Sequence, residues 1–200
     1  MRLVVGLGNP GARYARNRHN VGFMAAAAIA RRHGFAAPRS RFKGEVAEGV
    51  IGAERCLLLC PQTFMNASGE AVLAAMSFYK LAPDEIVVIH DELDLRPGKV
   101  RAKRGGGNAG HNGLRSITAT IGADFWRVRI GIGHPGIKEL VEPYVLQNFP
   151  MEELRGWVAP LVEAIAETIP LLIEGASQAF MSEVARLCPP PEFEEEDAAP

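Results

Sequence analysis

Residues 3–11, LVVGLGNPG, begin with a short apolar run that ends in glycines. An apolar run of this length, bounded by turn residues, predicts a buried strand. Residues 21–33 are Ala-rich with a basic end and are followed by Gly34, which predicts a helix with a C-terminal stop. A second buried strand is expected at 85–89, EIVVI. Strands that alternate with helices predict an α/β layer fold with a mostly parallel or mixed sheet.

The remaining segments continue this alternation. Asn66 precedes residues 67–81, whose apolar positions repeat at helical spacing, so we expect Asn66 to be the N-cap of that helix. From Glu152 onward the pattern predicts a long amphipathic helix, which Pro160 and Pro170 should bend or divide. Further strands are expected at 45–50, 55–59, 99–103 and 126–132, and a further short helix at 112–121.

The composition restricts the class of protein. The chain has 200 residues, of which 48% are hydrophobic and 22% charged, and this is ample for one domain with a full core. Only three Cys are present, which argues against a disulfide framework. No apolar run approaches the roughly 18 residues of a membrane span, and no signal-peptide pattern opens the chain. We therefore expect a reduced, cytoplasmic protein.

The net charge of −1 hides an asymmetry between the two parts of the chain. Residues 1–130 contain 19 Lys and Arg against 10 Asp and Glu, whereas residues 131–200 contain 3 against 13. The last residues, PPPEFEEEDAAP, cannot bury enough apolar surface to offset their chain entropy, so we expect a disordered tail. Such asymmetry is a hint of a nucleic-acid or membrane partner, although charge alone favours a merely solvated surface.

Residues 6–11 match the G-x-G-x-x-G spacing of dinucleotide sites, so a nicotinamide oxidoreductase is one hypothesis. That fingerprint needs a helix that opens at the second glycine, and an acidic residue about 20 positions later. Here Asn9-Pro10-Gly11 predicts a turn, and the stretch that should carry the acid reads AAAAIARR. The spacing recurs at 131–136. These glycines are better explained by tight turns and close backbone approach.

Two segments carry groups suited to acid–base chemistry. His19 follows a cationic loop and precedes a predicted helix, where it is either a general base or an exposed loop histidine. Residues 90–94, HDELD, follow a buried strand, and a carboxylate there could orient a histidine or bind a divalent metal. No H-E-x-x-H pattern is present, which argues against a metal site. The chain also has no G-x-S-x-G elbow and no cysteine with an activating neighbour, so direct attack by water is favoured over a covalent intermediate.

Residues 103–113, KRGGGNAGHNG, place two cations and several glycines before a predicted helix start. This pattern indicates either a loop that approaches a phosphate or ester closely, or a mobile surface loop. Residues 62–66, QTFMN, present an aromatic ring and an amide together, although Phe64 could be a core residue. Cys56 and Cys60 are expected in the core, since no further ligands accompany them for zinc.

Five motifs taken together strongly resemble those of bacterial peptidyl-tRNA hydrolases. The resemblance covers about residues 1–185, and only the acidic tail departs from it. The motifs occur in one order and spacing: VGLGNPGxxYxxxRHNVG (5–22), TFMNxSG (63–69), HDELDLxPG (90–98), GGGNAGHNGLRSI (105–117) and RVRIGIGHPG (127–136).

This resemblance implies a monomeric, cytoplasmic esterase that needs neither metal nor cofactor and releases peptides from peptidyl-tRNA. Its partner would be peptidyl-tRNA, and no membrane would be involved. The resemblance also implies a single three-layer α/β/α domain over residues 1–187, with a twisted mixed sheet flanked by helices. The acidic, Pro-rich tail would occupy residues 188–200.

The resemblance further implies roles for individual residues. His19 matches the catalytic base, and Asp91 matches the carboxylate that supports its proton-accepting form. Asn9 matches the residue that distinguishes N-blocked peptidyl-tRNA from free aminoacyl-tRNA. His111 could contact the substrate or be structural. Tyr14, Phe64, Asn66 and Asn112 match positions that bind the tRNA 3′ end and its peptide, and Arg101, Lys103 and Arg129 fall where cations of the family hold tRNA phosphates.

Overall fold

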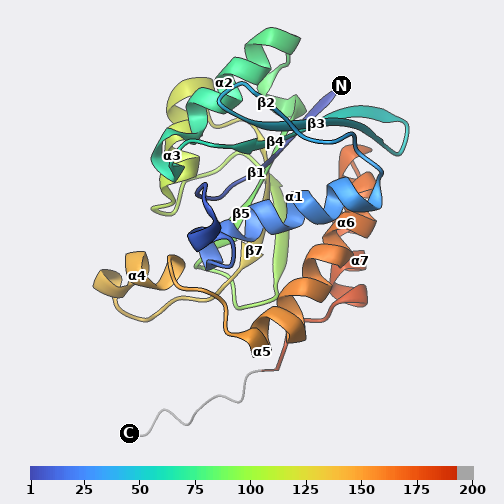
Figure 1. The fold of residues 1–200 in the computed structure, drawn as a ribbon. Helices are drawn as coiled ribbons and strands as arrows, with labels where there is room; N and C mark the ends of the chain where they lie inside the picture. The colour runs from blue at the N-terminus through green and yellow to red at the C-terminus, as the bar shows by residue number, and fades with distance from the viewer. Residues whose placement is uncertain (193–200) are drawn as a thin grey trace, which may run out of the picture.

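The computed structural model describes residues 1–192. Its centre is a seven-stranded sheet with the strand order β2-β3-β4-β1-β5-β7-β6 (Figure 1). The four central strands β4, β1, β5 and β7 are parallel, and the outer strands pair antiparallel at both edges, so the sheet is mixed. The strands are β1 (Arg2–Gly6), β2 (Arg39–Arg41), β3 (Gly44–Ile51), β4 (Glu54–Pro61), β5 (Ile86–Glu92), β6 (Val100–Arg104) and β7 (Trp126–Gly131).

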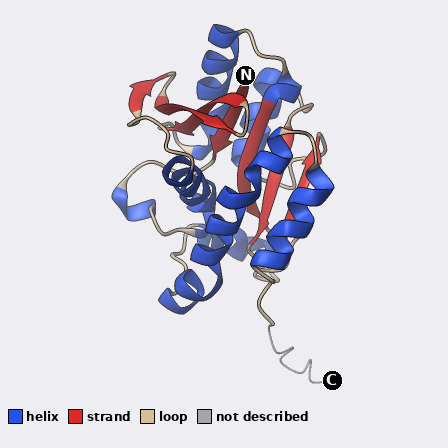
Figure 2. Cartoon of the chain, turned by 90° about the vertical axis from the view of Figure 1, so that its right-hand side faces the viewer, coloured by secondary structure: helices blue, strands red, loops and turns tan. Residues whose placement is uncertain are grey.

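Helices cover both faces of this sheet, as Figures 1 and 2 show. Successive residues of a strand point to opposite faces, so Val4 joins one core while Leu3 and Val5 join the other. The arrangement confirms the expected three-layer α/β/α fold. Helices α1 (Val21–Arg32), α6 (Ala159–Ile173) and α7 (Ser177–Leu187) pack on the first face, and α2 (Ser68–Tyr79) and α3 (Asn112–Ile121) pack on the second.

The first glycines allow α1 to lie very close to the sheet. A Cβ atom at Gly6 would collide with the carbonyl oxygen of Gly22, and a Cβ at Gly22 would collide with that of Ile89. Helix α1 begins only at Val21, well after Gly11, so its N-terminus does not follow the glycine turn as a dinucleotide site requires. The geometry therefore supports the close-packing interpretation over the nicotinamide hypothesis.

The prediction that Asn66 caps α2 is wrong. Asn66 lies within a 3₁₀ turn, Met65–Ala67, and the α-helix begins only at Ser68. The Ser68 hydroxyl donates to the carbonyl of Met65 at 2.9 Å, which tightens the turn. Because the turn precedes the helix, the side chain of Asn66 is exposed rather than folded back onto the helix N-terminus.

The two prolines do not divide the C-terminal helix. The chain is helical without interruption from Met151 to Ile173, through α5 (Met151–Glu153), a π-helical stretch (Leu154–Val158) and α6. Pro160 closely follows the π-helical stretch, where the hydrogen-bond pattern of the helix changes, and Pro170 lies close to the helix end.

This helix is also long and apolar enough to cross a membrane by length and composition, which the search for apolar runs did not predict. However, 61% of its most apolar window is buried inside the protein. Leu161, Ile165 and Ile169 have no exposed surface and belong to the core on the α1 face of the sheet. A buried core helix has the same length and composition, and the packing here is of that kind.

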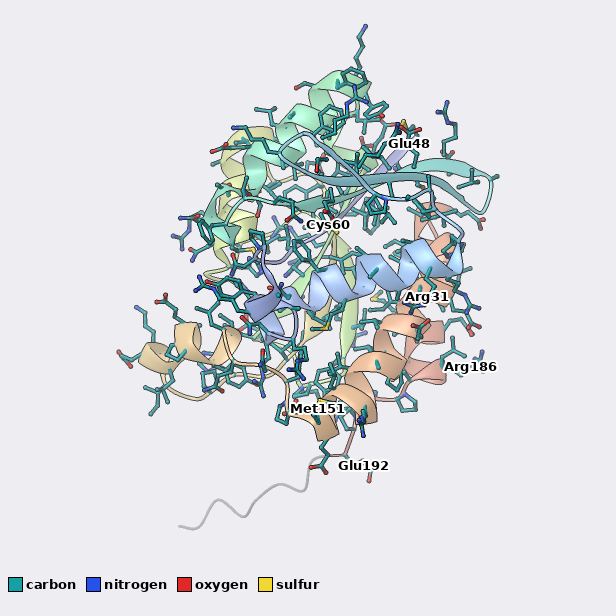
Figure 3. The ribbon with its side chains drawn as sticks, in the orientation of Figure 1. Arg31, Glu48, Cys60, Met151, Arg186 and Glu192 are labelled. Atoms are coloured by element: carbon teal, nitrogen blue, oxygen red, sulfur yellow. The ribbon has the colours of Figure 1, made fainter. Side chains whose placement is uncertain are left out.

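The predicted boundary at residue 187 coincides with the end of α7. Cys188 is nevertheless buried, and Pro190 and Pro191 lie against Gly98. The expected tail therefore starts with residues that contact the domain. Glu192, labelled in Figure 3, ends the described chain, and the acidic part of the predicted tail lies outside the described residues.

Candidate active site

A single buried carboxylate contacts two histidines near the C-terminal end of β5. Asp91 is 3% exposed, and the Nδ1 atom of His19 lies 2.9 and 3.0 Å from its two carboxylate oxygens. The Nε2 atom of His111 lies 3.0 Å from Asp91 Oδ1. The structure thus brings His19 and Asp91 together from positions far apart in the sequence.

His111 holds Asp91 and caps α3 at the same time. Its Nδ1 atom accepts hydrogen bonds from the backbone N–H groups of Gly113, at 3.1 Å, and Leu114, at 3.4 Å. Because Nδ1 accepts, the proton of the neutral ring must be on Nε2, which therefore donates to Asp91. The role that the sequence left open includes both helix capping and support of the carboxylate.

His19 presents a different nitrogen to the same carboxylate. It lies in the 3₁₀ turn Arg18–Asn20 that leads into α1, and its Nδ1–H donates to Asp91. Nε2 is then the ring nitrogen that keeps a lone pair. Burial lowers the pKa of His19, but the charge of Asp91 and its hydrogen bond together have the larger effect and raise this pKa above its ordinary value.

The surroundings keep Asp91 ionised. Burial alone would raise the pKa of Asp91, but the charges and hydrogen bonds of His19 and His111 hold it well below its ordinary value. The neighbouring His90 has its ring centroid 5.2 Å from that of His111, and its Nδ1–H donates to the carbonyl of Asp91 at 2.7 Å. Burial, aided by His111, lowers the pKa of His90 to about 3, so that ring is neutral near neutral pH.

Hydrogen bonds fix the orientation of Asn9 beside this cluster. Its backbone N–H donates to Asn20 Oδ1 at 3.0 Å, and Asn20 Nδ2 donates back to its carbonyl at 2.9 Å. Asn9 Oδ1 accepts the backbone N–H of Met65 at 2.9 Å. Within residues 1–192 the Nδ2 group of Asn9 has no hydrogen-bond partner. Because Asn9 lines a pocket, this Nδ2 group is a donor that is available to a bound molecule.

This pocket has a volume of about 660 Å³ and lies against the histidine cluster. His19, Asp91 and Asn9 line it, as do three of the predicted substrate-binding residues: Phe64, Asn66 and Asn112. Phe64 is 62% exposed and is therefore not a core residue.

Tyr14 is the predicted substrate-binding residue that does not line this pocket. It lies half-buried at the end of a 3₁₀ turn, Ala12–Tyr14, with the guanidinium of Arg13 stacked 4.5 Å from its ring centroid.

The predicted phosphate-binding cations differ in whether they are already paired with a carboxylate of the protein. Arg101 and Lys103 are exposed on β6 and have no ion pair with any described residue. Arg129 lies opposite Arg101 in the sheet register, but its Nε donates to the buried carboxylate of Glu92 at 2.8 Å. Part of the Arg129 guanidinium is therefore already used within the protein.

Neither Cys56 nor Cys60 offers a nucleophile. Burial raises the pKa of Cys56 to about 11 and that of Cys60, labelled in Figure 3, to about 12. Both thiols therefore stay protonated near neutral pH. Cys56 is a buried core residue as predicted, whereas Cys60 is only partly buried.

Sequence reasoning missed two parts of the site. Asn20, 2% exposed, holds the backbone of Asn9, and its place beside His19 in the motif of residues 5–22 was the available signal. The second part is one wall of the pocket, built by a short segment after β7 that contains α4 (Val141–Val145). Figure 1 shows α4 projecting from the body of the protein beside the site. Its wall residues are Lys138, Val141, Glu142, Val145 and Leu146.

Comparison with known proteins places the chain in a family. The sequence profile described as peptidyl-tRNA hydrolase matches residues 3–191. A peptidyl-tRNA hydrolase from Methylobacterium nodulans is 62% identical over 184 residues, covering 92% of this chain and 90% of its own length. One from Rhodospirillum rubrum is 57% identical over 192 residues, covering 96% of this chain and 79% of its own length.

Solved structures agree with this result. The crystal structure of peptidyl-tRNA hydrolase from Acinetobacter baumannii superposes with a TM-score of 0.86 at 41% identity, covering 92% of this chain and 94% of that one. The motifs, the sheet topology and the relatives all indicate the same assignment. The chain therefore belongs to the peptidyl-tRNA hydrolase family.

Proposed function

We propose that this peptidyl-tRNA hydrolase cleaves the ester between peptide and tRNA by direct attack of water, with His19 as the general base. The observation that carries this proposal is the hydrogen bonding around Asp91. His111 has used both of its ring nitrogens, whereas His19 has used only Nδ1. Nε2 of His19 is therefore the group that can accept a proton beside the pocket.

The reaction then follows from the positions of the proton and the ester. Nε2 takes a proton from water while the hydroxide part forms a bond to the ester carbonyl carbon. Asp91 stabilises the imidazolium that forms, as a carboxylate does beside a catalytic histidine. When the tetrahedral intermediate collapses, the carbon–oxygen bond to the ribose breaks, and the proton passes from His19 to the departing ribose oxygen.

The amides at the rim of the pocket suit the charge that develops on the carbonyl oxygen. Asn66 and Asn112 are both exposed and both line the pocket, so their Nδ2 groups can donate to an oxyanion. Phe64 offers an exposed ring for the 3′-terminal base or the peptide. Tyr14 would bind the tRNA outside the pocket, and Arg101 and Lys103 would contact phosphates farther along it.

The orientation of Asn9 supports a role in selecting N-blocked substrates. Its Nδ2 group is a donor, and a donor pairs with the carbonyl oxygen of an acylated α-amino group. A free α-ammonium group carries only donors and cannot make that bond. Asn9 would therefore separate peptidyl-tRNA from aminoacyl-tRNA by hydrogen-bond polarity.

A metal mechanism is the main alternative, because His19, Asp91 and His111 have ligand atoms within 4.8 Å of one another. The hydrogen bonds argue against it. The Nε2 atom of His111 carries a proton on the side that faces Asp91, so it has no lone pair there for a metal. The expectations of a cytoplasmic, monomeric enzyme that needs no membrane, metal or cofactor remain part of this proposal.

The test is cleavage of N-acetyl-aminoacyl-tRNA and of free aminoacyl-tRNA, each with and without EDTA. We expect rapid cleavage of the acetylated substrate that survives the chelator, and little cleavage of the free one. In Asn9→Ala the ratio between the two rates should shrink. Activity that disappears with EDTA and returns with added metal would overturn the proposed mechanism.

A further inference from the structure

The turn that carries His19 is joined to a distant part of the chain by a short backbone ladder. The N–H of Arg18 donates to the carbonyl of Gln147 at 3.0 Å, and an isolated antiparallel bridge pairs Asn17 with Asn148. The Asn17 amide also donates to Asn148 Oδ1 at 2.8 Å. This distant segment directly follows α4, so it connects the pocket wall to the turn of His19.

The side chain of Arg18 reinforces the ladder. Arg18 is 6% exposed, and its guanidinium donates to the carbonyl of Asn148 at 3.3 Å and to Glu153 Oε1 at 3.2 Å. The same guanidinium stacks on two rings, 4.4 Å from the centroid of Tyr144 and 5.3 Å from that of Phe149. Tyr144 belongs to α4, and Asn148 and Phe149 follow that helix. The Arg18 side chain therefore contacts both α4 and the residues after it.

A buried arginine in this place is not explained by packing alone. Desolvating a cation is costly unless it is paired, and an apolar side chain would fill the same space without that cost. Arg18 does not line the pocket and has no part in the proposed proton transfer. What it does provide is a planar, charged group that reaches α4, the segment after it and Glu153 simultaneously.

We propose that Arg18 is a positioning residue that fastens the α4 wall of the pocket to the turn that carries His19. The proposal rests on the function proposed above. Val141 and Val145 line the pocket from α4, while Tyr144 on the same helix contacts Arg18. A peptide bound against this wall is thereby held at a fixed distance from the base.

The first test compares variants of two arginines in the same loop. Arg18→Met should lower kcat/KM on N-acetyl-aminoacyl-tRNA by about tenfold or more, because small displacements of reacting groups are costly. Arg18→Lys should recover only part of this, since lysine can pair with Glu153 but lacks the planar face for stacking. Arg16→Met is the matched control: it removes the same charge from an exposed side chain, and kcat/KM should stay within about twofold.

The second test asks whether Arg18 acts through α4. Tyr144→Leu removes the ring under the guanidinium, and the double variant with Arg18→Met completes a double-mutant cycle in kcat/KM per folded molecule. If the two residues form one unit, the double variant should lose little more than Arg18→Met alone. Losses that multiply independently would overturn the proposal.

Two further results would also overturn it: wild-type kcat and KM in Arg18→Met, or a loss of activity that only follows the unfolded fraction measured by circular dichroism. If the wild-type enzyme itself fails to cleave the substrate, the proposed function is wrong. Amide hydrogen exchange then tests directly whether Arg18 holds α4 in place. We expect faster exchange over residues 138–147 in Arg18→Met and unchanged exchange in Arg16→Met. Equal exchange in the two variants would contradict the role of Arg18.

Discussion

The two segments that meet at Asp91 make similar contacts and have different consequences. The turn before α1 supplies His19, and the glycine-rich loop before α3 supplies His111; the two rings lie 4.8 Å apart. Both rings bond to the same carboxylate oxygen of Asp91, at 2.9 and 3.0 Å. His111 also satisfies the first N–H groups of α3, whereas the second nitrogen of His19 is left for the pocket.

Under the proposed mechanism, residue type and distance do not by themselves identify the base. Each histidine has the right chemistry and lies beside the same carboxylate. What separates them is how many of their ring nitrogens are already used by the protein. A base is the histidine with an unused nitrogen at the substrate, and a histidine with both nitrogens used orients the carboxylate.

The largest effect should come from His19→Ala. Loss of a general base typically lowers the rate about 10²–10⁴-fold, and we expect kcat on N-acetyl-aminoacyl-tRNA to fall within that range. The variant should remain folded, because His19 belongs to neither hydrophobic core and Asp91 keeps its hydrogen bond from His111. A kcat near the wild-type value would show that His19 is not the base and that the contrast with His111 is misjudged.

Asp91→Asn should also lower kcat strongly, because the imidazolium loses its counter-charge. It should also change the pH profile. In the wild type Asp91 raises the pKa of His19, so the neutral base is lost as pH falls through that raised pKa. In the variant burial remains while the charge is gone, so the pKa falls and the acid limb of kcat/KM should move to lower pH. An acid limb that stays in place would mean that another group titrates.

His111 can be separated into its two tasks by two substitutions. His111→Ala removes both the cap of α3 and the bond to Asp91, and should cost about 1 kcal/mol of stability as well as activity. His111→Asn retains a capping side chain but is too short to hold Asp91, so it should keep stability and lose activity by about tenfold. Denaturant titration and kcat measured on the same samples would compare them. Full activity in His111→Asn would reduce His111 to a helix cap.

The smallest effect on kcat is expected for the exposed cations of β6, Arg101 and Lys103. Arg101→Ala combined with Lys103→Ala should weaken tRNA binding while leaving kcat at saturation unchanged. Each lost phosphate contact should lower the slope of log K against log salt by about 0.7–0.9. Arg31→Ala, which breaks only a surface pair with Glu163, is the control for lost charge (Figure 3). Equal salt slopes for all three proteins would reject the phosphate role.

Helices and strands were predicted correctly where apolar periodicity and turn residues determine them. The predicted helix at 112–121 coincides with α3, and the apolar runs at 3–5 and 85–89 are strands in the centre of the sheet. Asn66 was assigned wrongly because a 3₁₀ turn delays the helix, and propensity does not specify that delay. Pro160 and Pro170 were expected to bend or divide the last long helix, but helical backbone continues past both, with a π-helical stretch just before Pro160.

The sequence pointed to the main residues that line the pocket, but not to the contacts that hold them in place. The family motifs pointed to His19, Asp91 and Asn9, and the structure brings all three to one pocket. The task of His111 was left open, because helix capping and the bond to Asp91 exist only in three dimensions. The α4 wall contains none of the family motifs. The few apolar residues around Pro143 do not indicate which surface of the protein they will face.

The bridge between Asn17 and Asn148 has a consequence for the synthesis of the enzyme, because it joins residues 131 positions apart. Chains emerge from the ribosome N-terminus first and fold as units once enough sequence is available. The segment that carries His19 is made well before its partner, because Asn148 follows Asn17 by 131 residues. A nascent chain therefore holds the proposed catalytic side chains before Gln147 and Asn148 are available to fix the turn that carries His19.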